Sequence, residues 1–192
     1  MVEQEVKLAF ESVEAARQAV IAAGGRLVVS RRLLVDTLFD SRDGRLQRER
    51  CALRLRRDAG KAFLTFKGPP QPGPVKSREE IETLVGSADV VEALLRALGF
   101  QSGFLHEKFR EEYDMDAAHV TIDETPIGTF VEIEASPGEI ERAAARLGRS
   151  QADYRLESYA RLFMQWCEAR GLTSSEMRFP QEGDGSVFHR AD

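Results

Sequence analysis

Alternation of apolar and charged residues is the strongest pattern along this chain. In the segment ALRLRR, Leu53 and Leu55 alternate with Arg54 and Arg56, which is the period of a strand with two unlike faces. Related patterns recur elsewhere. The expected strand segments are VEQEVKLAF (2–10), Leu27 to Phe39, LQRERCALRLRR (46–57), KAFLTFKG (61–68), SREEIETLV (77–85), FLHEKFREEYDM (104–115), AHVTIDETP (118–126) and IGTFVEIEAS (127–136).

Other segments have the spacing of amphipathic helices. Ser12 can cap the first of these helices, and Gly24 with Gly25 can end it. Ser87 can cap the second, whose apolar stripe is expected to be Val91, Leu94, Leu95 and Leu98. The predicted helices cover residues 12–23, 87–99, 137–147 and 151–170.

Prolines and composition divide the chain further. The segment GPPQPGPVKS (68–77) is predicted to be a loop, because proline cannot complete a sheet ladder. Residues 1–172 are expected to form one α+β domain. Residues 173–192 are polar and aperiodic, and we expect them to be a loosely ordered tail without chemistry of its own.

Charge narrows the classes of partner. A formal net charge of −5 and a pI near 5.4 argue against binding to nucleic acids and to membrane surfaces, which are polyanions.

Cys51 and Cys167 lack the spacing of metal ligands and are expected to be buried thiols. No signal-peptide pattern or membrane-length apolar run is present, so we expect a cytoplasmic protein. Its expected oligomeric state is a monomer or a homodimer.

The polar faces of the predicted strands carry pairs of charges at positions i and i+2. On one strand this pattern is ordinary for a face in water, but its recurrence indicates a shared charged surface. If the sheet closes into a barrel, this face of every strand points inward and lines a tunnel. The tunnel charges would be Glu3, Glu5, Lys7, Arg54, Arg56, Lys67, Arg78, Glu80, Glu82, Lys108, Arg110, Asp123, Glu132 and Glu134.

Such a mixture of charges suits a polyphosphate bound together with a metal. Arginine forks match phosphate oxygens, and lysine supplies a point charge. Carboxylates suit Mg²⁺ or Mn²⁺, which take oxygen ligands and bridge to phosphates. A hydrated tunnel also avoids the cost of burying unpaired charges.

The motif Glu3-x-Glu5-x-Lys7 resembles the ExExK signature of the CYTH domain, whose members are also called triphosphate tunnel metalloenzymes. LFD, ALRLR, LTFKGP, SREEIE, ALGF, EKFREEY, VTIDET and IGTFVEIE follow in the family's order, so the resemblance covers roughly Val2 to Leu162. It implies a closed antiparallel eight-stranded β-barrel with flanking helices, whose tunnel binds a triphosphate-containing small molecule with a divalent metal.

The resemblance also implies roles for individual residues. The metal-binding carboxylates would be Glu3, Glu5, Glu132 and Glu134. The substrate-binding cations would be Lys7, Arg54, Arg56, Lys67, Arg78, Lys108 and Arg110, and other tunnel positions would be Glu80, Glu82 and Asp123. Glu5, Lys7, Arg56 and Lys67 are expected to be catalytic.

One part of the chain departs from the family pattern. Some members have a lysine in the C-terminal helix, where this chain has Ser158-Tyr159-Ala160. We expect Tyr159 to pack or cap the helix rather than to take part in catalysis. His106, His119 and His189 have no spacing typical of metal ligands, and surface or packing roles are expected for them.

Three functions remain open at this stage. The first is a metal-dependent hydrolase of inorganic triphosphate, thiamine triphosphate or a nucleoside triphosphate. The second is a class IV adenylyl cyclase that converts ATP to cyclic AMP and pyrophosphate. The third is a non-catalytic polyphosphate- or nucleotide-binding module on the same barrel.

Overall fold

The computed structural model describes residues 2–180 and 189–190 of the 192-residue chain. Its main sheet has the strand order β10-β6-β2-β3-β4-β5-β1-β8-β7, and β6 also pairs with β7. This additional pairing closes β1 to β8 into an eight-stranded antiparallel barrel, so the expected fold class is confirmed. β10 adds a parallel partner to β6.

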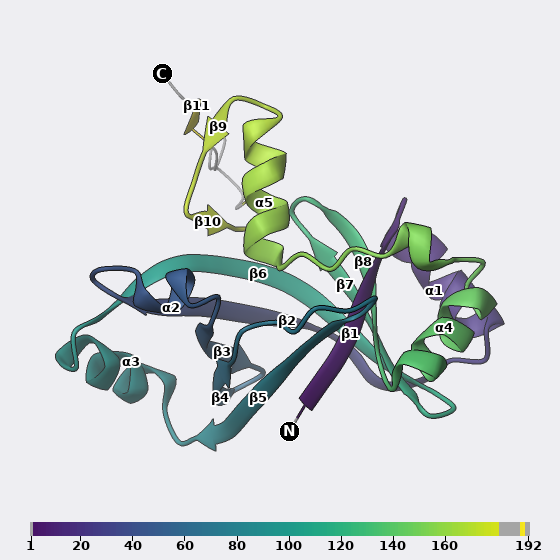
Figure 1. Cartoon of the computed structure of the whole chain (residues 1–192), viewed down its shortest axis with the longest axis horizontal. Coiled ribbons are helices and arrows are strands. Elements are labelled where there is room, and N and C mark those ends of the chain that lie inside the picture. Colours follow the sequence, from purple (N-terminus) through teal and green to yellow (C-terminus); the bar gives the residue numbers. More distant parts are fainter. Residues whose placement is uncertain (1, 181–188, 191–192) are drawn as a thin grey trace. The chain divides into compact units, whose positions relative to one another are not determined.

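Figure 1 labels these elements along the chain. The barrel strands are β1 (Val2–Phe10), β2 (Arg26–Ser41), β3 (Ala52–Asp58), β4 (Lys61–Lys67), β5 (Lys76–Val85), β6 (Phe100–Met115), β7 (Ala118–Thr125) and β8 (Gly128–Glu134). Short strands follow as β9 (Leu172–Thr173), β10 (Glu176–Met177) and β11 (His189–Arg190). The helices are α1 (Val13–Ala22), α2 (Arg45–Arg48), α3 (Ala88–Ala97), α4 (Pro137–Arg146), a 3-10 turn η1 (Gln151–Asp153) and α5 (Tyr159–Glu168).

The chain forms two compact units, each of which is described by itself. The first unit comprises Met1–Arg32, Pro69–Glu80 and Phe109–Leu156, and the second comprises Leu33–Gly68, Ile81–Lys108 and Glu157–Asp192.

Helices α1 and α4 cover the apolar strand faces of the first unit. Val6 and Leu8 of β1, Ile133 of β8, and Ala16 and Val20 of α1 are fully buried in one hydrophobic cluster. Since the apolar residues of each strand alternate with charged ones, burial of this face turns the charged face the other way. The helices therefore fix the side of the sheet on which the charges lie.

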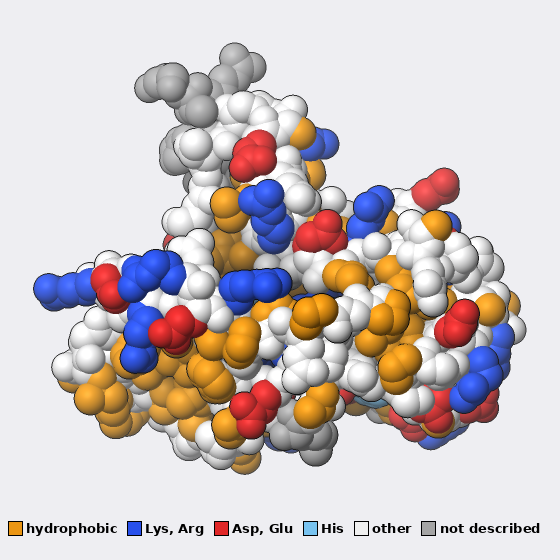
Figure 2. Space-filling view, in the orientation of Figure 1, with side chains coloured by type: hydrophobic (Ala, Val, Ile, Leu, Met, Phe, Trp, Pro, Cys, Tyr) orange, Lys and Arg blue, Asp and Glu red, His pale blue; other side chains and the backbone are white. Residues whose placement is uncertain are grey.

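In the second unit, α3 packs on the apolar face of β2 and β3. Leu95 of α3 is buried in a cluster with Phe39 and Leu55. The stripe expected on this helix is only partly buried, because Leu94 and Leu98 are 55% and 66% exposed. Figure 2 shows hydrophobic side chains gathered on the surface over α3.

Two predicted boundaries are wrong. The segment predicted as one strand from residue 46 begins instead as α2, and its chain turns at Arg50, which has a positive φ of 58°, before β3 starts. The helix predicted for residues 151–170 starts only at Tyr159. Upstream of it, Arg155 exchanges backbone hydrogen bonds with Lys7 of β1, which holds this stretch extended.

Smaller differences concern loop and tail residues. Gln71, inside the predicted proline loop, forms a β-bridge with Ser77, and β5 already begins at Lys76. In the segment expected to be a loosely ordered tail, Met177 of β10 is fully buried. Residues 181–188 and 191–192 of that tail lie outside the described residues. Of the two cysteines, Cys167 is buried and Cys51 is partly exposed.

Within the described part of the chain, every helix is too short or too polar to cross a membrane.

Candidate functional site

Strand register in the first unit brings the predicted charges of β1 and β8 opposite one another. Glu5 pairs with Glu134, and Lys7 pairs with Glu132. Directly opposed residues on one face of an antiparallel pair have their Cβ atoms about 5 Å apart, so these side chains can interact. The alternation in VEQEVKLAF and FVEIE thus places acids and bases on a common face.

Lys7 lies between two carboxylates of this face. Its Nζ atom is 3.3 Å from Oε1 of Glu5 and 3.1 Å from Oε1 of Glu132, and the lysine is only 2% exposed. Burial by itself would lower the pKa of Lys7, but the charges of Glu132 and Glu5 outweigh it and raise that pKa above its ordinary value. Lys7 is therefore a permanent cation in this setting.

The same chain of ion pairs continues through β6 and β7. The guanidinium of Arg110 donates to both carboxylate oxygens of Asp123, at 2.6 Å each, and to Oε2 of Glu132. Asp123 is fully buried. Charges this far from water are tolerable only when each has a partner, and here each carboxylate lies against a cation.

Strand β5 completes the charged face of the first unit. Lys76, which the sequence interpretation had left in the proline loop, pairs with Oε1 of Glu5. Arg78 is opposite Glu3 in register, and Glu80 follows on the same face. We call the set Glu3, Glu5, Lys7, Lys76, Arg78, Glu80, Arg110, Asp123, Glu132 and Glu134 the first charged cluster.

The second unit carries its own charged cluster, centred on Arg56. The Nε and Nη2 atoms of Arg56 donate to the two oxygens of Asp36, at 2.7 and 2.8 Å. Asp36 is 1% exposed and was not among the predicted residues. Burial would raise the pKa of Asp36, but the charges of Arg56 and Arg54 together with hydrogen bonds hold it well below its usual range.

Beside this pair, Glu82 of β5 joins two neighbouring strands. Its Oε2 atom accepts hydrogen bonds from Arg54 of β3 at 3.2 Å and from Thr65 of β4 at 2.7 Å. Lys67 lies at the end of β4, in register with Ala52. The predicted residues Arg54 and Glu82 are thus hydrogen-bonded to each other, and Thr65 is hydrogen-bonded to the same carboxylate.

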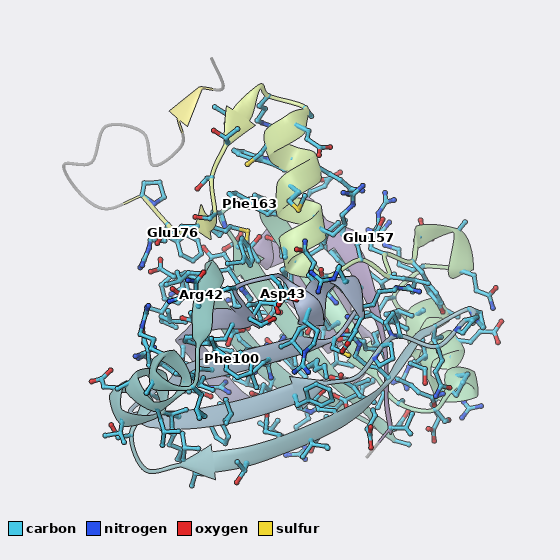
Figure 3. The ribbon with its side chains drawn as sticks, turned by 60° about the vertical axis from the view of Figure 1, so that its left-hand side comes forward. Arg42, Asp43, Phe100, Glu157, Phe163 and Glu176 are labelled. Carbon is cyan, nitrogen blue, oxygen red and sulfur yellow. The ribbon has the colours of Figure 1, made fainter. Side chains whose placement is uncertain are left out.

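A buried group of aromatic residues lies next to Asp36. The His106 ring stacks on Phe104 at 5.4 Å and contacts Tyr159 at 5.8 Å, measured between ring centroids. The ammonium group of Lys108 lies 4.7 Å from the centre of the Tyr159 ring. Phe163 of α5, labelled in Figure 3, packs against Phe104 and is fully buried. The packing role expected for Tyr159 is confirmed, since it is 7% exposed.

His106 has a polar contact that its sequence context did not indicate. Its Nε2 atom is 3.2 Å from Oδ2 of Asp36, and the residue is 6% exposed. His119, in the first unit, has a side chain that is 40% exposed and lies 3.5 Å from Glu112. The side chain of His189 lies outside the described residues.

Burial of His106 predicts a pH-dependent stability. Burial lowers the pKa of His106 below 6.5, although Asp36 opposes this shift and Lys108 and Arg56 add to it. The unfolded chain then binds the proton more readily, so stability is complete above pH 6.5 and falls as the pH drops below it. The slope cannot exceed about 1.4 kcal/mol per pH unit for one proton.

Urea unfolding between pH 5 and 7.5 measures this slope. His106→Gln should flatten it, because the substituted side chain does not titrate. His119→Gln is the matched control, since it removes a partly exposed imidazole and leaves His106 in place. A slope that is the same in wild type and His106→Gln would contradict the prediction.

The chemistry of the first charged cluster fits a divalent cation. Glu3, Glu5, Glu132 and Glu134 offer only carboxylate oxygens, which Mg²⁺ and Mn²⁺ prefer over nitrogen or sulfur. In the described residues, no three His, Cys, Asp or Glu side chains are grouped closely enough to hold an ion. Glu5 and Glu132 instead face Lys7, Lys76 and Arg110. The four glutamates therefore match Mg²⁺ or Mn²⁺ in the type of ligand atom that they offer.

The protein is thus a closed antiparallel barrel whose strands carry interleaved cations and carboxylates. The CYTH domain model matches residues 1–158, which is most of the chain. The chain belongs to the CYTH family, as its motifs predicted.

Individual relatives agree with this assignment. A Methanocaldococcus jannaschii protein named "Putative adenylate cyclase MJ0240" is 28% identical over 141 residues, which are 73% of this chain and 80% of that protein. The solved structure of PH1819 from Pyrococcus horikoshii OT3 is 27% identical and has a TM-score of 0.69, over 85% of this chain and 99% of that one. A Vibrio parahaemolyticus structure described as a "putative adenylate cyclase" has a TM-score of 0.74 at 20% identity, over 85% and 98% of the two chains.

Proposed function

We propose that this protein is a divalent-metal-dependent phosphohydrolase that acts on a small triphosphate. The observation that carries the proposal is the interleaving of buried cations with carboxylates, with Lys7 between Glu5 and Glu132. Such a set can bind phosphate oxygens and a hard cation together. The family assignment supports the same class of substrate.

In this proposal, phosphate oxygens bind to Lys7, Arg110 and Arg78 of the first cluster. Arg54, Arg56, Lys67 and Lys108 of the second unit are the other predicted phosphate ligands. Bound phosphate oxygens would replace part of the carboxylates as the anionic partners of these cations. Because arginine presents a rigid fork of donors, Arg110 in the first unit and Arg56 in the second would each set the orientation of the phosphate group that it binds.

The reaction needs positioning and charge stabilisation more than covalent chemistry. Water attacks the terminal phosphorus in line, the bond from that phosphorus to the bridging oxygen breaks, and the diphosphate part leaves with this oxygen. The proton that the water loses passes to the solvent. Glu5 would orient this water. A metal held by Glu3, Glu5, Glu132 and Glu134 would supply neutralisation of the charge on the phosphoryl oxygens.

Adenylyl cyclase activity is the second candidate, and the name of the M. jannaschii relative is the observation that favours it. In that reaction the ribose 3′-hydroxyl of ATP attacks the α-phosphorus and pyrophosphate leaves. A Hippeastrum structure with a TM-score of 0.64 is described as a "putative adenylyl cyclase" that reveals a dominant triphosphatase activity. At 20% identity it shows a shared fold, so it is consistent with either reaction here.

One set of incubations separates the candidates. Purified protein is mixed with Mg²⁺ or Mn²⁺ and, separately, with inorganic triphosphate, thiamine triphosphate or ATP. We expect phosphate release that stops when EDTA is added. Cyclic AMP as the main product from ATP would establish the cyclase instead. Binding of triphosphate without any product would establish the non-catalytic module.

A further inference from the structure

The two ring nitrogens of His106 have different surroundings. Nε2 lies 3.2 Å from Oδ2 of Asp36, whereas Nδ1 is buried and has no hydrogen-bond partner among the described residues. A neutral imidazole carries its proton on one nitrogen, and a carboxylate can only accept. The network therefore assigns the proton to Nε2, which donates to Asp36.

Asp36 is held from two directions by this arrangement. Arg56 contacts both of its oxygens, and His106 contacts Oδ2 on the imidazole side. These two partners fix the plane of the Asp36 carboxylate. Because Arg56 donates to both oxygens, the carboxylate in turn fixes the plane of the Arg56 guanidinium. His106 is thus connected to Arg56 through a single buried side chain.

Packing keeps the imidazole itself in place. Phe104 stacks on it with an angle of 20° between the rings, and Tyr159 of α5 contacts it at 37°. The charged or titratable groups around it are Asp36 on β2, Arg56 on β3, Lys108 on β6 and Tyr159 on α5. Two of these are cations, which oppose a positive charge on the imidazole.

We propose that His106 is a positioning residue for Arg56: a neutral imidazole orients Asp36, and Asp36 holds the guanidinium in the plane in which it receives a phosphate group. This inference rests on the proposed function, because it assumes that Arg56 binds phosphate. It gives His106 a role that a packing residue of the same size could not fill.

Two substitutions distinguish positioning from packing. His106→Gln keeps an N–H donor at about the distance of Nε2, whereas His106→Leu keeps apolar bulk and loses the donor. The dissociation constant of inorganic triphosphate is measured in EDTA by calorimetry. His106→Leu should raise it about 3- to 10-fold, the usual effect of one hydrogen bond, and His106→Gln should recover most of this loss.

The same substitution in an Arg56→Ala background provides a stricter test. If His106 acts through Arg56, His106→Leu has no further effect on binding once Arg56 is absent. Equal losses in His106→Leu and His106→Gln, or an undiminished effect in the Arg56→Ala background, would show a packing role and overturn the proposal. Triphosphate binding by His106→Leu with the wild-type dissociation constant would also overturn the proposal.

A measurement without substrate separates this proposal from the proposed function. In a ¹H–¹⁵N spectrum, the Nε–H signal of Arg56 should be sharp in the wild type and in His106→Gln, and broadened by exchange in His106→Leu. If the wild type binds no triphosphate, the proposed function fails, and this signal alone decides whether His106 orders Arg56. A sharp, unshifted signal in His106→Leu overturns the proposal.

Discussion

Substitution of Glu5 by glutamine is expected to reduce metal-dependent phosphate release by more than about 100-fold, which is the upper range for loss of a group that merely supports a metal ligand. Glu5 is 7% exposed and lies opposite Glu134, with Lys7 and Lys76 at its carboxylate. Glutamine keeps the size of the side chain and removes the charge that attracts a cation. Phosphate release at saturating Mg²⁺ and a titration with Mn²⁺ measure the effect.

Glu79→Gln is the matched control for this substitution. Glu79 lies on β5 next to Arg78, on the exposed face of the strand. The Glu79→Gln protein should release phosphate at the wild-type rate. Circular dichroism checks that Glu5→Gln is folded. A folded Glu5→Gln protein with wild-type turnover and Mn²⁺ affinity would remove Glu5 from both the metal site and the catalytic set.

The second large effect is expected at Arg56. Arg56→Ala should raise KM for triphosphate roughly 10- to 150-fold, since a hydrogen bond to a charged group contributes about 1.5–3 kcal/mol. The substitution also leaves buried Asp36 without its cation, so the melting temperature should fall. Arg56→Lys keeps a charge near Asp36 and loses the fork, and it should give an intermediate KM.

The adjacent residue provides the comparison for Arg56. Arg57 points to the other face of β3, where it pairs with Asp89 at 2.8 Å and Glu92 at 3.1 Å. Asp89 has a side chain that is 90% exposed, so this ion pair should contribute at most about 1 kcal/mol. Arg57→Ala should therefore leave KM unchanged. Equal increases in KM for Arg56→Ala and Arg57→Ala would exclude a specific phosphate contact at Arg56.

Strand alternation was enough to predict which faces of the sheet carry charge. Side chains in a strand alternate by geometry, so the apolar residues that pack under α1 and α4 fix the direction of their neighbours. The motif with Glu5 and Lys7 and the later pair Glu132 and Glu134 were found in this way, and the structure places Glu5 opposite Glu134 and Lys7 opposite Glu132. The roles of these residues stay predictions.

Asp36, Lys76 and His106 could not be found by the same reasoning. Asp36 shares its face with Leu34 and Leu38 and has no charged neighbour two residues away. Lys76 follows a run of prolines that indicated a loop. Their importance comes from partners on other strands, such as Arg56 and Glu5, and those contacts depend on register between distant segments.

The same limit explains the wrong helix start. The spacing from residue 151 onward is compatible with a helix, but the backbone of Arg155 bonds to Lys7, which is far away in sequence. Ser158 then caps the helix, because its side chain accepts from the N–H of Arg161. A sequence window around residue 155 contains no trace of this contact with β1.

Helix α5 also affects where the protein can be shortened. The family match ends at residue 158, one residue before this helix begins. Yet Tyr159 and Phe163 supply one wall around His106 and Phe104, and the Tyr159 ring lies over Lys108. The limit of family similarity is therefore not the limit of the folding unit. A chain cut at Ser158 would expose His106 and Phe104 to water. It would also remove the aromatic ring that lies over the predicted site residue Lys108.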